Sequence, residues 1–130
     1  MKEKHRFQEF RMFNFLRSAP SAPPPSVAEI AAKVARNEMT LVDVREMAEI
    51  KASGKAKGAV AIPLSILGLK CDPQAADCMI SHDKPVALYC ASGGRSSMAA
   101  QTLSRLGYAQ VYNIGGFGDW MAGGGQVEKI

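Results

Sequence analysis

The sequence predicts a single α/β domain with a mainly parallel central sheet. Four short apolar runs, separated by helical patterns, indicate buried strands at residues 41–44, 59–62, 86–89 and 111–114. Strands that alternate with helices pair in parallel, because each helix carries the chain back across the sheet. The 130 residues, 47% hydrophobic and 22% charged, suit one globular domain. No apolar run approaches the roughly 18 residues of a membrane span.

Residues 1–25 precede this domain as a basic N-terminal segment and a proline-rich linker. Residues 1–17 hold +3 of the formal charge of +4, so the pI of about 9.1 is a weak argument for nucleic-acid binding. The linker at 18–25 cannot continue a helix and favours an extended chain. We prefer a loose tail or a helix packed on its own domain, with a membrane-surface or partner-binding helix as the alternative. The apolar residues at helical spacing in this segment are Phe7, Phe10, Phe13 and Leu16.

The domain itself is expected to cover residues 26–130. Ser26 and Glu29 fit a capping box, in which each side chain bonds the backbone N–H of the other residue at a helix start. The helix that follows has one apolar face, made of Val27, Ile30, Ala31, Val34 and Ala35. The next elements are expected to be a strand at 41–44, a short helix at 46–51, a strand at 59–62, a helical turn at 65–69 and an irregular connection over 70–84.

The second half of the domain is built around one strand, its loop and a helix. The expected elements are a strand at 86–89, a helix at 97–106 ended by Gly107, a strand at 111–114, a turn at Gly115–Gly116 and a short helix at 117–121. The loop at residues 90–96 joins the strand to the helix. In a parallel sheet this junction lies at the carboxyl edge, where ligand sites collect.

Cys90 ends the strand, and the loop after it has the composition of an anion-binding cradle. Glycines permit backbone conformations in which successive N–H groups point inward, and the helix start turns its positive end to the same place. The cradle residues are Ala91, Ser92, Gly93, Gly94, Arg95 and Ser96. Such surroundings lower a cysteine pKa from about 8.5 and favour the nucleophilic thiolate. We therefore predict that Cys90 takes a group from an anion and holds it covalently, rather than acting as a small buried hydrophobe.

The size of the loop separates two chemistries. Cys90 and Arg95 enclose four residues, whereas cysteine-dependent phosphatases and related arsenate reductases use Cys-x5-Arg to surround a tetrahedral oxyanion. A shorter ring suits one sulfur atom better than a phosphoryl group. Those enzymes also need an acid to protonate the leaving group, whereas sulfite leaves without one.

Four patches resemble the single-domain rhodaneses, a family of sulfurtransferases. They are Leu41 to Glu46 (Leu-Val-Asp-Val-Arg-Glu), Gly58 to Pro63 (Gly-Ala-Val-Ala-Ile-Pro), Tyr89 to Ser96 (Tyr-Cys-Ala-Ser-Gly-Gly-Arg-Ser) and Gly115 to Trp120 (Gly-Gly-Phe-Gly-Asp-Trp). The resemblance covers about residues 26–128 and implies a rhodanese-like three-layer α/β/α domain. It also implies that Cys90 carries a persulfide, formed with thiosulfate or another persulfide and passed to cyanide or a thiol.

Two supporting residues and one departure follow from the same resemblance. Asp43 and Arg45 are expected to brace the site, as a strand-end ion pair or through loop hydrogen bonds. Arg45 would lie beside the loop, where orienting an anionic donor is its alternative role. Lys55 stands where many members have a structural histidine, so local hydrogen bonding is expected to differ. With Lys51 and Lys57 it is expected to form a solvated basic edge, with attraction of an anionic donor or an acidic partner as the alternative. Trp120 is expected in the core.

Cys71 and Cys78 are expected to be exposed loop thiols. Their Cys-x6-Cys spacing is not that of a zinc ribbon and no histidine pair accompanies it, so we expect no metal and no cofactor. A resolving thiol that reacts with Cys90 is an alternative without support. Three cysteines and the lack of an apolar signal sequence favour a reducing, cytoplasmic setting, with a monomer as the default assumption.

The expected partners are a small anionic sulfur donor, a cyanide or thiol acceptor and, as a further option, a protein that accepts sulfur. Nucleic acid and a membrane span are not expected. Two alternatives to a sulfurtransferase stay open. One is a non-enzymatic sulfur carrier or interaction module that docks through residues 1–25. The other, a cysteine-dependent phosphatase or arsenate reductase, is disfavoured by the short loop.

Overall fold

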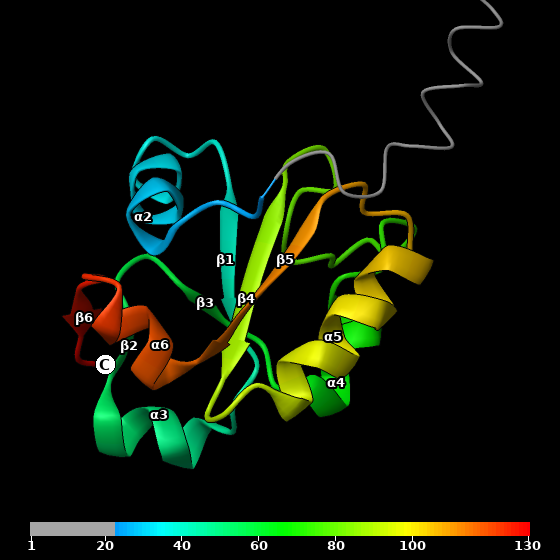
Figure 1. Ribbon diagram of the computed structural model, residues 1–130. Helices are drawn as coiled ribbons and strands as arrows, with labels where there is room; N and C mark the ends of the chain where they lie inside the picture. Colours follow the sequence, from blue (N-terminus) through cyan, green and yellow to red (C-terminus); the bar gives the residue numbers. More distant parts are fainter. Residues whose placement is uncertain (1–22) are drawn as a thin grey trace, which may run out of the picture.

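A four-stranded parallel sheet forms the centre of the computed structural model, which describes residues 23–130 (Figure 1). Its strands lie in the order β3 (Val60–Ala61), β1 (Thr40–Asp43), β4 (Val86–Cys90) and β5 (Val111–Gly116). All three pairings are parallel. The predicted α/β class and parallel sheet are therefore confirmed. The helix considered within residues 1–17 lies outside the described residues.

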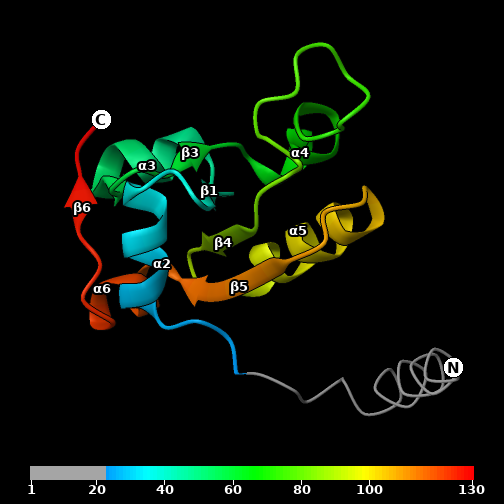
Figure 2. The same cartoon turned by 90° about the horizontal axis from the view of Figure 1, so that it is seen from above.

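Helices cover both faces of the sheet, as Figures 1 and 2 show. On one face lie α4 (Leu64–Lys70) and α5 (Gly94–Arg105), and on the other α2 (Val27–Ala35) and α6 (Phe117–Ala122). Side chains along a strand point alternately to the two faces. Along β4, Leu88 and Cys90 therefore join the core under α4 and α5, while Ala87 and Tyr89 join the core under α2 and α6. This arrangement is the expected three-layer α/β/α architecture.

The helix starts follow from their capping residues. At α2 the predicted capping box is present, with Ser26 Oγ accepting from Glu29 N–H at 3.1 Å and Glu29 Oε1 accepting from Ser26 N–H at 2.7 Å. At the short helix α3 (Met47–Ser53), Glu49 Oε1 accepts from the Glu46 N–H at 2.8 Å, while the Glu49 N–H donates to the Glu46 backbone carbonyl at 3.0 Å. Within residues 23–130, no helix has the length and apolar content needed to cross a bilayer.

Several elements differ from the sequence prediction. The helix α5 begins at Gly94 rather than at residue 97, because Gly93 adopts a left-handed conformation (φ 110°) and acts as its N-cap. The expected turn at Gly115–Gly116 is the end of β5, where Gly115 (φ 109°) accompanies a shift in the register with β4. A two-stranded antiparallel sheet of β2 (Lys55–Ala56) and β6 (Val127–Glu128) was not expected, since two-residue strands leave no periodic pattern.

The predicted solvated edge of lysines is wrong for Lys55. Its ammonium group pairs with Glu128 across β2 and β6, and its side chain is only 17% exposed. Lys57 Nζ lies 3.4 Å from Gln126 Oε1 on the same C-terminal segment. The residue at the usual histidine position therefore ties the C-terminal strand to the body of the domain.

Trp120 is buried in the core, as expected.

Candidate active site

Cys90 lies where β4 ends and the loop to α5 begins, at the carboxyl edge of the sheet (Figure 1). Its two neighbouring strands are β1 and β5, so the cysteine stands at the centre of this edge. The residue is buried, with 1% of its surface exposed. The loop residues Ala91 and Ser92, directly after it, are exposed. The sulfur is thus enclosed by protein on most sides but lies next to the surface.

Hydrogen-bond donors of the loop surround this sulfur. The Gly93 N–H donates to Cys90 Sγ at 2.9 Å and the Ser96 N–H at 3.4 Å. In its thiol form, Cys90 Sγ donates to Ser96 Oγ at 3.5 Å. Of the residues from which the sequence predicted an anion-binding cradle, Gly93 and Ser96 therefore direct their amides toward the sulfur atom.

These contacts change the acidity of the thiol. Burial raises the pKa of Cys90, but hydrogen bonds from the Ser96 side chain and from the amides of Ser96, Gly93 and Ser92 outweigh it and lower the pKa to about 7. A free cysteine titrates near 8.5. Near neutral pH a substantial fraction of Cys90 is therefore thiolate, the form that acts as a nucleophile.

The two loop glycines do different things. Gly93 has φ 110°, a conformation that disfavours any residue with a side chain, and this geometry turns its N–H toward Cys90. Gly94 is the first residue of α5, and a Cβ atom there would meet nothing within 4 Å. Gly93 therefore has the positive φ and the inward-pointing N–H that the cradle was expected to use, whereas Gly94 lies outside the region of positive φ.

Three residues that brace the loop were not predicted, because they come from the next strand and helix. Asn113 Oδ1 accepts from Ser96 Oγ at 2.7 Å and from Gly115 N–H at 2.9 Å. A Cβ atom on Gly116 would lie 2.4 Å from the Ala91 carbonyl oxygen, so only glycine lets β5 approach the loop so closely. Asp119 Oδ2 accepts from Gly116 N–H at 2.7 Å. The repeated glycines were the signal in the sequence, but their contact with the loop appears only in three dimensions.

Arg95 does not project into the ring of amides. Its guanidinium group donates to both carboxylate oxygens of Glu49 on α3, at 2.7 and 2.9 Å. This contact and the Glu46 N–H lower the pKa of Glu49 to about 2, so the carboxylate is ionised at neutral pH. The negative charge of Cys90 helps to raise the pKa of Arg95, so the cation still lies within electrostatic range of the sulfur. Glu49 was missed because its pairing depends on how α3 packs.

Asp43 and Arg45 form a buried ion pair. The guanidinium group of Arg45 contacts both carboxylate oxygens of Asp43, and also donates to Ser53 Oγ at 2.9 Å and to the Gly54 carbonyl at 2.8 Å. It lies 4.4 Å from the centroid of the Phe117 ring. Arg45 therefore holds the end of β1 to the end of α3. The geometry supports the bracing role and gives no support to orientation of a donor.

The expectation of exposed loop thiols is wrong for Cys71. This residue caps the end of α4 and is fully buried in the core, and burial raises its pKa to about 12. Tyr108 Oη donates to the Cys71 carbonyl at 2.6 Å. Cys78 is half-buried, and its Sγ donates to the Ile80 carbonyl at 3.2 Å. Burial was underestimated because the connection between α4 and β4 folds onto the core.

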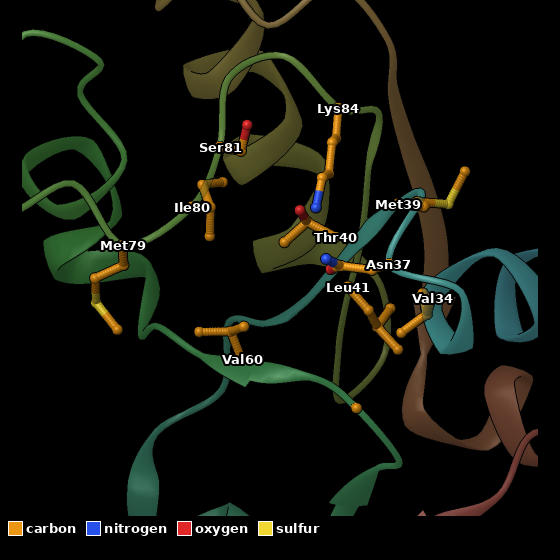
Figure 3. Close-up of a pocket in the computed structure, with 11 residues that line it drawn as sticks. Val34, Asn37, Met39, Thr40, Leu41, Val60, Met79, Ile80, Ser81 and Lys84 are labelled. Carbon is orange, nitrogen blue, oxygen red and sulfur yellow. The ribbon is translucent and has the colours of Figure 1, made fainter.

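A pocket of about 250 Å³ lies near the start of β1 (Figure 3). Figure 3 shows Thr40, Asn37 and Lys84 at one side of it and Val60 and Met79 at another. It is at the amino edge of the sheet, because Thr40 opens β1 whereas Cys90 closes β4. This cavity is therefore separate from the cysteine site.

A parallel α/β/α sheet with a cysteine at its carboxyl edge, bonded by the amides of a short loop, is the arrangement expected of the rhodanese class. The profile of the rhodanese-like domain matches residues 26–123. The chain therefore belongs to the rhodanese-like domain family.

Two relatives and one solved structure illustrate this similarity. The uncharacterized Bacillus subtilis protein YqhL is 43% identical over 89 residues. These residues cover 68% of this chain and 63% of YqhL, so the match spans less than two thirds of that relative. A sulfurtransferase of Allochromatium vinosum is 34% identical over 79 residues, covering 61% of this chain and 67% of the relative. The structure of the human single-domain sulfurtransferase TSTD1 is 27% identical with a TM-score of 0.65, covering 78% of this chain and 97% of that one.

Proposed function

We propose that the protein is a sulfurtransferase that carries sulfane sulfur as a persulfide on Cys90. The observation that carries this proposal is the hydrogen bonding of Cys90 Sγ by the Gly93 and Ser96 amides. Donors so placed stabilise the thiolate before the reaction, and they suit the anionic outer sulfur of a persulfide after it. Membership of the rhodanese-like family and the similarity to sulfurtransferases support the same chemistry.

The reaction has two steps. The Cys90 thiolate attacks the outer sulfur of the donor, a new S–S bond forms, and the S–S bond of the donor breaks. With thiosulfate the leaving group is sulfite, and with a persulfide it is a thiolate; either takes the electron pair of the broken bond. A thiol acceptor in its thiolate form, or cyanide, then attacks the outer sulfur and leaves as a persulfide or as thiocyanate. Cys90 returns to the thiolate, which the Gly93 amide stabilises as a leaving group.

Measurement of the intact mass tests the proposal. Incubation with thiosulfate or with a small-molecule persulfide should add the mass of one sulfur atom, and cyanide should remove it. Cys90→Ser should gain none. The matched control is Cys78→Ser, since Cys78 is a half-buried thiol on another segment and should load as the native protein does. Full sulfur transfer by Cys90→Ser would overturn the proposal.

The same samples separate the alternatives. A non-enzymatic carrier would load Cys90 but would not turn over when donor and acceptor are both in excess. A phosphatase would hydrolyse an aryl phosphate. We expect no such hydrolysis, because Arg95 is engaged by Glu49 and the amides close around a single sulfur atom. We expect a reducing compartment such as the cytoplasm, where the thiolate persists between cycles.

A further inference from the structure

The one charged residue of the cradle is already engaged. Arg95 is the only ionisable residue between positions 91 and 96, and both of its terminal nitrogens donate to the carboxylate of Glu49. The side chains of this pair are 34% and 37% exposed, so the pair lies at the surface of the loop rather than in the core. A guanidinium group in a two-point contact with one carboxylate has most of its charge compensated.

The charges next to Arg95 leave no excess of positive charge at this place. Glu46, at the start of α3, also helps to raise the pKa of Arg95 and so lies within range of it. Arg45, the other arginine of this region, is buried against Asp43. One carboxylate therefore binds this guanidinium group and a second lies within electrostatic range of it, beside a sulfur that is itself anionic as a thiolate. A dianion approaching Cys90 meets repulsion that the loop amides alone must offset.

Resting on the proposed function, we propose that Glu49 is a positioning residue that sets the class of sulfur donor. By holding Arg95 it withholds the cation that a sulfonate group would need, and so favours persulfides of organic thiols over thiosulfate. Attack on thiosulfate places two negative charges beside the carboxylates and releases sulfite dianion. Attack on a persulfide transfers the outer sulfur and releases a thiolate with one negative charge. In both reactions one S–S bond forms and one breaks, so no oxidant or reductant is consumed.

Glu49→Gln isolates this effect because it keeps the helix start. Glutamine retains Oε1, which accepts from the Glu46 N–H at 2.8 Å, but it loses the charge and one of the two oxygens that bind Arg95. Arg95 is then available to a sulfonate. We expect KM for thiosulfate to fall at least about tenfold, the size of one charge-assisted hydrogen bond, with a smaller change in kcat. With an uncharged-tail persulfide, N-acetylcysteamine persulfide, we expect a change of less than about twofold.

Two further variants make the result specific. Glu38→Gln removes the same charge from an exposed pair with Arg36, before the start of β1 and so away from the carboxyl edge, and should change neither donor. In the double variant Glu49→Gln with Arg95→Gln, the improvement with thiosulfate should disappear, because it depends on the released guanidinium group. A general loosening of α3 would instead affect both donors and would not depend on Arg95.

The outcomes distinguish this inference from the proposed function. If the native protein gains sulfur from neither donor, as measured by intact mass, both proposals are overturned. Suppose instead that the native protein gains sulfur. If the Glu49→Gln variant then shows the native preference between the two donors, or if the double variant keeps the lower KM for thiosulfate, only the role of Glu49 is overturned. A selective fall in KM for thiosulfate that requires Arg95 supports it.

Discussion

Removal of the Ser96 hydroxyl group tests the physical basis of the site. In Ser96→Ala the amide at 3.4 Å from Cys90 Sγ is kept, and the hydroxyl group at 3.5 Å is lost. A hydrogen bond to a charged group contributes about 1.5–3 kcal/mol. Because this contact is long, and because the hydroxyl proton must turn from Asn113 Oδ1 to reach the ionised sulfur, we take the lower end, which corresponds to a rise of about one pKa unit. The pKa of Cys90 should therefore rise from about 7 toward 8.

The assay is the rate of alkylation of Cys90 by iodoacetamide as a function of pH. At pH 7 the thiolate fraction should fall from about one half to about one tenth, so alkylation should slow about fivefold. Above about pH 9 the two proteins should react at similar rates. Ser97→Ala is the matched control, because Ser97 is exposed and its amide bonds the Gly93 carbonyl. An unchanged midpoint in Ser96→Ala would refute the view that this hydroxyl group stabilises the thiolate.

Three other outcomes are expected. Gly93→Ala should lower the free energy of unfolding by about 1–3 kcal/mol and load sulfur poorly, because a φ of 110° strains any residue with a side chain. Gly94→Ala should be neutral or slightly stabilising, because a Cβ atom there meets nothing within 4 Å. Urea unfolding measures the stability and intact mass the loading of both variants, and equal effects would contradict this argument. Arg45→Met should lower the free energy of unfolding by about 3–5 kcal/mol, because it leaves Asp43 buried without its partner, and a change within 1 kcal/mol in urea unfolding would contradict this. The rate of sulfur loading of Cys90 should fall as the pH is lowered through about 7, because protonation removes the nucleophile, and a rate independent of pH between 5 and 9 would count against a thiolate.

Elements with a strong local signal were predicted well. The apolar run of β4 and the capping box of α2 are local patterns, and both lie where the sequence placed them. The short strands β2 and β6 were missed, because each is only two residues long and is stabilised by a partner more than seventy positions away. The start of α5 was placed three residues late, because glycine has a low helix propensity and the left-handed N-cap at Gly93 is a conformational choice.

The candidate site likewise has a part that the sequence predicted and a part that only the folded structure showed. Cys90 and its cradle are contiguous, so the order of residues alone indicated a nucleophile beside inward-facing amides. The partners of the cradle come from other segments: Glu49 from α3, and Asn113 and Gly116 from β5. The role of Arg95 changed most, because the sequence shows its charge but not the carboxylate that binds it.

The order of amino acids determined the class of fold, the position of the reactive cysteine and the shortness of its loop, since each depends on residues adjacent in the chain. Tertiary packing decided the environment of that cysteine: how far its acidity is shifted, which face of the sheet it joins and whether Arg95 is free. These properties depend on distances between segments that only the folded sheet brings together. Hydrogen bonding and burial act over a few ångströms in space and not along the chain.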